Sequence, residues 1–183
     1  MKNEIQIGNI LVSKPFIEDK RFNKTVILIT EKTDEGVVGF ILNKETNYKT
    51  HDFLEKIDSK KFNSTINYGG PVDTNSLFFI HRYPDIIQNS EKINNELCWG
   101  GELKSVISGI KSGKINQNYI LFCLGYTGWK KGQLEQEIKE GSWILHQIEI
   151  REFNTKINWS NILTSIDKEY EIWANAPLNF HLN

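Results

Sequence analysis

The chain has 183 residues, of which 39% are hydrophobic and 25% charged, and this composition excludes wholesale disorder because it can bury a core. The length favours one domain over two. With 22 basic and 23 acidic residues the net charge is −1, so a strongly basic nucleic-acid surface is not indicated. The longest apolar runs, residues 26–29 and 119–124, are far shorter than the roughly 20 residues that a membrane helix needs, and no membrane association is expected.

Short runs of β-branched and aromatic residues, bounded by glycine, proline and other turn residues, predict strands. In chain order these runs are residues 10–13, 25–30, 37–42, 65–68, 76–81, 118–124 and 143–148. Only a short turn ending at Gly36 separates the second run from the third. We therefore expect these two strands to pair as an antiparallel hairpin.

Apolar residues at helical spacing, together with capping and stop signals, predict helices. In chain order these are residues 50–57, 101–111, 133–139 and 158–166. The glycine-rich residues 125–132 are expected to form a loop before the third helix, and the last ten residues are expected to be loose. Strands and helices mix without strict alternation. This predicts a single compact α/β or α+β domain over residues 1–183, with mixed β-sheets flanked by helices.

The expected loop at residues 125–132 carries the main binding hypothesis. Its three glycines would let a backbone approach a ligand, and free N–H groups at the following helix start would favour an anion or carboxylate. The alternative is that the glycines only supply positive φ for a tight turn, with Trp129 packed as a lid. The hypothesis requires unpaired amides between residues 124 and 133 that solvent can reach. The candidate ligand-binding residues are Asn43, Gly69, Gly70, Pro71, His81, Gly125, Tyr126, Gly128, Trp129, Gln133 and Glu137.

Several of these candidates also have simpler explanations. Gly69 and Gly70, followed by Pro71, place bare backbone at a strand end, but turn chemistry alone accounts for them. Asn43 either offers hydrogen bonds in a cleft or closes a strand through an Asx turn. His81 acts as a base if a carboxylate lies beside it, and is otherwise an ordinary polar group at a strand end.

Motifs for catalysis, metal binding and DNA readout are missing from the sequence. The four histidines lack metal-ligating spacing and no GxSxG is present, so no metal, cofactor or catalytic residue is expected. Cys98 and Cys123 match no metal or redox spacing, and we expect buried thiols rather than a disulfide. Only three of the 22 basic residues are arginine, the usual reader of bases, so charge does not support nucleic-acid binding.

The run from Gly125 to Ile138, GYTGWKKGQLEQEI, resembles the signature of the YqgE/AlgH family, as does the run YGGPV at residues 68–72. Further segments agree in order, at residues 8–13, 19–22, 36–43, 77–81 and 141–143. The resemblance covers residue 7 to about residue 166. It implies a compact α/β domain with mixed sheets in a bacterial cytosolic protein, without an established activity. Some family members carry a transcriptional-regulator label, which comes from a genetic link to alginate production.

Three functions follow as hypotheses. The leading one is a non-enzymatic cytoplasmic protein that binds a small ligand or a protein partner around residues 125–137. A transcriptional regulator would instead require a contiguous lysine-rich surface and a salt-sensitive affinity for DNA. A hydrolase-like enzyme would require Glu137, His81 or Asn43 within about 3 Å of one another or bridged by water. Five tryptophans in a chain of this size are compatible with a homodimer.

Overall fold

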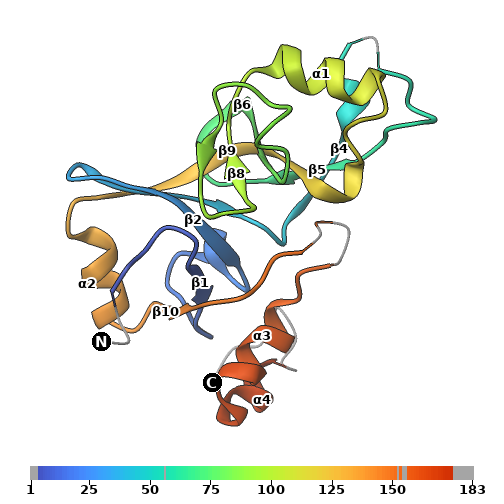
Figure 1. Cartoon of the computed structure of the whole chain (residues 1–183). Coiled ribbons are helices and arrows are strands. Elements are labelled where there is room, and N and C mark those ends of the chain that lie inside the picture. Colours follow the sequence, from blue (N-terminus) through green and yellow to red (C-terminus); the bar gives the residue numbers. More distant parts are fainter. Residues whose placement is uncertain (1–3, 56, 152, 154–155, 175–183) are drawn as a thin grey trace.

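One long strand, β9 (Ile120–Lys130), joins the two parts of a mainly antiparallel sheet (Figure 1). The computed structural model describes residues 4–55, 57–151, 153 and 156–174. The second half of β9 is followed on one side by β3 (Gly36–Ile41), β2 (Val26–Lys32), β1 (Ile10–Ser13) and β10 (Trp143–His146). The first half pairs antiparallel with β6 (Val72–His81) and parallel with β5 (Thr65–Tyr68). Outside these lie the shorter strands β8 (Cys98–Trp99), β7 (Glu91–Lys92) and β4 (Glu45–Lys49).

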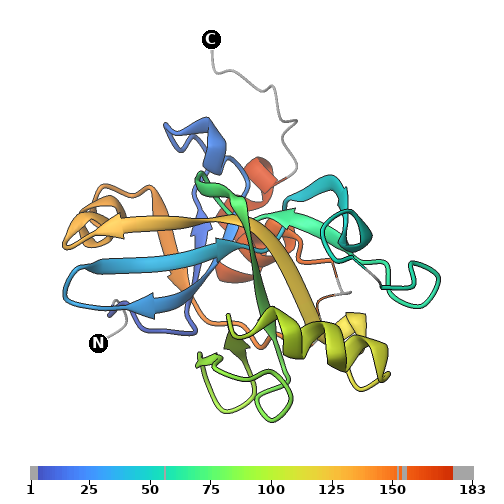
Figure 2. The same cartoon turned by 90° about the horizontal axis from the view of Figure 1, so that it is seen from above.

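Helices cover the sheet in separate places. The α-helices of the described residues are α1 (Leu103–Lys111), α2 (Gln133–Lys139), α3 (Trp159–Ile166) and α4 (Glu171–Ala174). Single 3-10 turns occur at η1 (Lys20–Phe22), η2 (Thr50–Asp52), η3 (Gln117–Tyr119) and η4 (Lys168–Tyr170). Figures 1 and 2 show α1 on the half of the sheet that contains β6, and α2 at the end of β9. The fold is therefore the single mixed α+β domain that the sequence predicts.

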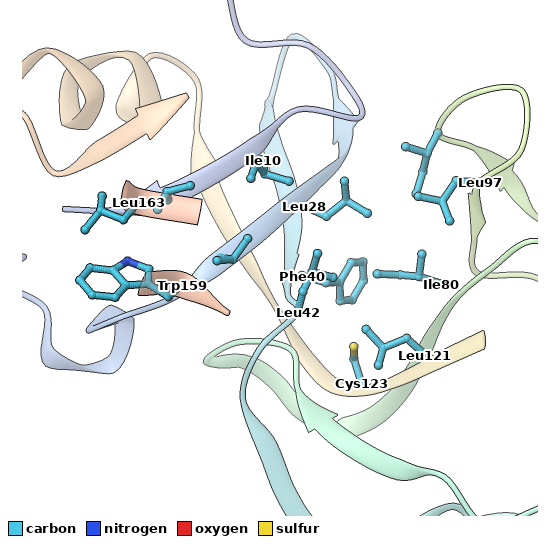
Figure 3. Close-up of a cluster of buried hydrophobic side chains, with 13 residues drawn as sticks. Ile10, Leu28, Phe40, Leu42, Ile80, Leu97, Leu121, Cys123, Trp159 and Leu163 are labelled. Carbon is cyan, nitrogen blue, oxygen red and sulfur yellow. The ribbon is translucent and has the colours of Figure 1, made fainter. Parts of the chain in front are cut away.

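The apolar core is divided by the sheet. One cluster extends from α3, where Trp159 and Leu163 are buried, past Ile10 and Leu28 to Ile80 on β6 (Figure 3). A second cluster lies beneath α1, and a third lies beneath α2 around Trp129. Fully burying one side chain of this size contributes about 1.5–3 kcal/mol, so these contacts dominate the stability of the domain.

The segment after β10, residues 147–151, crosses the sheet and is called the strap below. Arg82, at the end of β6, holds it through Nη1, which donates to the carbonyl oxygens of Ile150 at 2.9 Å and Arg151 at 3.1 Å. The chain then enters α3, where Trp159 Nε1 donates to the Ser13 carbonyl oxygen at 2.8 Å. These bonds fix the C-terminal helices to strands that are distant in sequence.

Most predicted elements are confirmed, with boundary changes. The hairpin of β2 and β3 is antiparallel as expected, and α3 begins after Asn158, whose side chain caps it. The helix expected at residues 50–57 is wrong, because the described residues of this range, 50–55 and 57, form only the η2 turn. Thr50 Oγ1 accepts from the Ser64 amide at 3.2 Å instead of capping a helix, and Phe53 is exposed. Residues 175–183, most of the tail expected to be loose, lie outside the described residues.

Candidate binding cleft

The glycine-rich run does not form the expected loop, because residues 125–130 continue β9. Gly125 lies where the strand changes partners, with a φ of +69°, and a Cβ there would be 2.5 Å from the Gly70 carbonyl oxygen. Gly69 belongs to the same crossing: its amide donates to the Leu124 carbonyl at 2.8 Å, and its carbonyl accepts from Ile41 at 2.9 Å. These three glycines let two backbones cross closely. Residues 125–130 form a paired strand rather than a loop with a row of free amides, so that part of the hypothesis is corrected.

The start of α2 also differs from the expected anion site. The helix has seven residues, and its side rather than its N-terminus faces the open space. Gln133, Glu137 and Glu140 follow one another at helical spacing along that side. Gln133 Oε1 accepts from the Lys130 amide at 3.0 Å, which turns the chain from β9 into the helix.

A cleft of about 500 Å³ opens beside the second half of β9. It is lined by residues 17–22 around η1, the start of β6, the end of β9, and the segment from α2 into β10. Figure 2 shows η1 and the start of β6 on one side of β9, with α2 at its end. The cleft gathers five of the candidate residues, namely Pro71, Gly128, Trp129, Gln133 and Glu137. The other six, Asn43, Gly69, Gly70, His81, Gly125 and Tyr126, do not line it.

Glu137 is the central polar group of the cleft. Its Oε2 accepts from the indole N–H of Trp129 at 2.9 Å and from that of Trp143 at 2.8 Å. Its Oε1 accepts from Gln133 Nε2 at 2.9 Å. The two indole rings meet edge to face with centroids 6.0 Å apart, and both tryptophans are buried. One carboxylate therefore joins β9, α2 and β10 at the base of the cleft.

The opposite wall is formed by η1. Asp19 accepts from Arg21 Nε at 3.0 Å and from Nη2 at 2.6 Å, and this hydrogen-bonded guanidinium holds the pKa of the Asp19 carboxyl below its usual range. The Arg21 guanidinium also lies 5.9 Å from the centroid of the Phe22 ring, which packs edge to face on Trp143. The ion pair is exposed, so its contribution to stability is small.

Negative charge exceeds positive charge in this lining. The ionisable residues that line the cleft are Glu18, Asp19, Arg21, Glu137 and Glu140. The only cation among them, Arg21, is already paired with Asp19. The remaining carboxylates favour a ligand that carries positive charge or several hydrogen-bond donors.

Asn43 and His81 have structural roles away from the cleft. Asn43 joins the ends of β2 and β3, because its Oδ1 accepts from the Val26 amide and its Nδ2 donates to the Lys24 carbonyl, both at 2.9 Å. His81 is fully buried, its Nδ1 accepts from the Tyr83 amide at 3.1 Å, and Nε2 therefore donates to the Gly100 carbonyl at 3.2 Å. Burial lowers the pKa of His81 to about 4.

Tyr126 also points elsewhere, since its ring packs edge to face on Phe78 with centroids 5.7 Å apart. The trio Glu137, His81 and Asn43, which the hydrolase hypothesis requires, is not brought together.

Sequence reasoning missed the η1 wall and Trp143. A signal for both was present, because residues 19–22 and 141–143 are among the segments on which the family resemblance is based.

The described residues also bear on metal binding and membrane insertion. No cluster of three or more His, Cys, Asp or Glu side chains within them is placed to hold a metal ion. None of the helices in that part of the chain is both long and apolar enough to cross a membrane. Cys98 and Cys123 are buried, and both thiols are free.

Comparison with known proteins relates the whole domain to one family. A family model described as AlgH-like matches residues 10–171. A UPF0301 protein of Cytophaga hutchinsonii is 35% identical over 180 residues, which cover 96% of this chain and 98% of that protein. A UPF0301 protein of Parabacteroides distasonis is 34% identical, over 96% of this chain and 90% of that protein.

Two solved structures have the same fold. A crystal structure of a Corynebacterium diphtheriae protein superimposes with a TM-score of 0.77 at 19% identity, over 96% of this chain and 95% of that one. The solution structure of the AlgH protein from Pseudomonas aeruginosa gives a TM-score of 0.69 at 22% identity, over 97% and 99% of the two chains. With a matching family model and relatives of more than 30% identity along almost the full length, the chain belongs to the AlgH-like family.

Proposed function

We propose that the protein is a non-enzymatic binding protein that takes a small ligand or a protein partner into the cleft beside β9. The observation that carries this proposal is the meeting of four segments, distant in sequence, around one opening of about 500 Å³. That volume falls within the range of about 300–1,000 Å³ typical of ligand pockets. The polar groups at its base are held by buried neighbours, so the cleft is preorganised for an occupant.

The chemistry of the lining favours a cationic occupant. Carboxylates of Glu18, next to η1, and Glu140, at the end of α2, line the cleft, and Ser142 also belongs to its lining. Aromatic and aliphatic surface comes from Phe22 and Val72. An amine or guanidinium attached to an apolar stem would match both kinds of surface.

A thermal-shift screen tests this function. The probes are free arginine, lysine, spermidine and choline, with glutamate and citrate as anionic counterparts. A ligand present at 100 times its Kd stabilises the native state by about 2.7 kcal/mol, so at least one cationic probe is expected to raise the melting temperature.

Two variants of one residue locate the binding. Val72 lines the cleft and is 38% exposed, so Val72→Trp is expected to fill the opening while leaving the core intact. The shift should disappear in Val72→Trp and persist in the matched control Val72→Ala. The proposal fails if no probe shifts the wild-type protein, or if Val72→Trp responds as the wild type does.

A further inference from the structure

One edge of β9 faces the cleft. In an antiparallel ladder, residues alternate between those whose N–H and C=O groups point to the partner strand and those whose groups point away. The Lys131 amide donates to the Glu35 carbonyl at 2.9 Å, and the register pairs Trp129 with Val37. The backbone groups of Trp129 therefore point to β3, and those of Gly128 point away from it.

Both neighbours of this position agree with that alternation. The Lys130 amide, which also points away from β3, is taken by Gln133 Oε1 at 3.0 Å. On the other side, the pairing of β9 with β6 ends at Tyr126, opposite Val72. Among the described residues, no strand pairs with Gly128 on the side away from β3. An outward N–H and C=O of Gly128 are thus presented at the wall of the cleft.

Gly128 also leaves room for another backbone. It is exposed, and a Cβ at this position would meet only the Tyr126 ring, at an ordinary 3.5 Å. The crossing of strands does not require a glycine here, unlike at Gly125, where a Cβ would be 2.5 Å from a carbonyl oxygen. A glycine in a strand is typical of a place where another backbone approaches closely.

We infer that the occupant of the cleft is an extended peptide that adds to the edge of β9 at Gly128 and carries a basic side chain. This inference rests on the binding function proposed above and names its partner. One peptide residue exchanges two hydrogen bonds with the N–H and C=O of Gly128, as in other cases of strand addition. Side chains of directly opposed residues lie on the same face of a sheet, so those of the two flanking peptide residues lie on the Trp129 face.

Charge complementarity decides what those flanking side chains are. The Trp129 face of the cleft is the one covered by α2, which contributes Glu137, and Glu140 follows at the C-cap of this helix. Lysine or arginine at a flanking position would face these carboxylates, whereas an acidic side chain would be repelled. The class of partner is therefore a short basic segment in an extended conformation.

The test uses the peptide acetyl-Val-Lys-Val-Lys-Val-amide and two matched variants of it. The first carries an N-methyl group on the central valine, which removes the donor to Gly128. The second has both lysines replaced by glutamate. On the protein, Gly128→Pro removes the outward N–H without removing a ladder hydrogen bond, and Gly128→Ala keeps it. Calorimetry gives Kd, and amide NMR spectra report whether the Gly128 resonance moves.

The wild-type protein is expected to bind the lysine peptide with a shift of the Gly128 amide resonance. Binding should weaken roughly tenfold or more with the N-methyl peptide and with Gly128→Pro, and stay unchanged in Gly128→Ala. Because the N-methyl peptide leaves the protein unaltered, the comparison of the two peptides remains valid even if Gly128→Pro folds poorly. Glu140→Gln should weaken binding several-fold and reduce its salt dependence.

Absence of binding by the lysine peptide, equal binding of the N-methyl peptide, or preference for the glutamate peptide would each overturn the inference. Failure of this inference can be told apart from failure of the proposed function. If spermidine or arginine shifts the wild type but not Val72→Trp while no peptide binds, the cleft is a ligand site and the peptide inference alone is wrong.

Discussion

Replacement of Glu137 by alanine would remove the acceptor shared by two buried indoles. Trp129 and Trp143 are 6% and 2% exposed, so removal of the carboxylate leaves two largely buried indole N–H groups without their protein acceptor. A buried donor left without a partner costs about 1–3 kcal/mol. Two such donors predict a loss of about 4 kcal/mol in the free energy of unfolding. For a chain of this length that corresponds to a fall in Tm of roughly 8–16 °C.

Glu137→Gln separates the loss of charge from the loss of the acceptor. The amide oxygen can still accept from both indoles, but as a neutral acceptor it forms weaker hydrogen bonds than a carboxylate. Its NH₂ group would also face Gln133 Nε2, which now donates to Glu137 Oε1 at 2.9 Å. The expected loss is about 1–2 kcal/mol, well below that of Glu137→Ala.

Urea unfolding followed by far-UV circular dichroism at pH 7 measures both losses. Glu135→Ala is the matched control, because Glu135 is exposed on the same helix and does not line the cleft. It should change stability by no more than about 0.5 kcal/mol. The reasoning is refuted if Glu137→Ala lies within about 1 kcal/mol of the wild type, or if Glu137→Gln is as damaging as Glu137→Ala.

Three further predictions concern the scaffold. Burial lowers the pKa of His81 from 6.5 to about 4, so the unfolded chain binds the proton more readily. About 3 kcal/mol of stability, fully present above pH 6.5, should be lost as pH falls to 4. Urea unfolding at a series of pH values should show that His81→Gln lacks this pH-dependent loss. Gly70→Ala would place a Cβ 2.2 Å from the Tyr126 carbonyl oxygen and should cost about 3 kcal/mol or more, whereas Gly128→Ala should be nearly neutral; melting temperatures compare the two. Arg82→Ala removes both hydrogen bonds to the strap and the ion pair with Glu96, and should destabilise the protein by about 2–3 kcal/mol, with faster tryptic cleavage after Arg151.

Local patterns in the sequence were sufficient to predict the elements whose partners are near in the chain. The β2–β3 hairpin follows from two β-branched runs and a short turn at Gly36, and α3 follows from its Asn158 cap and the spacing of Trp159 and Leu163. Residues 50–57 have comparable helical spacing and yet form only one 3-10 turn. There the Thr50 side chain bonds to Ser64, a tertiary contact that no local pattern reveals.

The glycine run at residues 125–132 was misinterpreted for a related reason. Glycines next to a predicted helix usually indicate a loop, but a close crossing of two backbones also requires residues without a side chain. The partner in that crossing is Gly70, more than fifty residues earlier, and a single sequence does not show which segments cross. The same limit applies to the cleft, whose η1 wall meets α2 only through the fold.

The two kinds of residue in the cleft allow stability and binding to be varied separately. Glu137 is half-buried and binds two buried indoles, so substitution of any of these three residues would alter folding and binding together. Glu140 and Val72 are exposed and line the opening, and their replacement by glutamine and tryptophan leaves the buried hydrogen bonds in place. If the cleft binds an occupant, variants of the exposed pair should change affinity at constant Tm. If the cleft were only a packing gap between η1 and α2, substitutions of the two exposed residues would change neither affinity nor Tm. Only substitutions of Glu137 and the two indoles would then lower Tm.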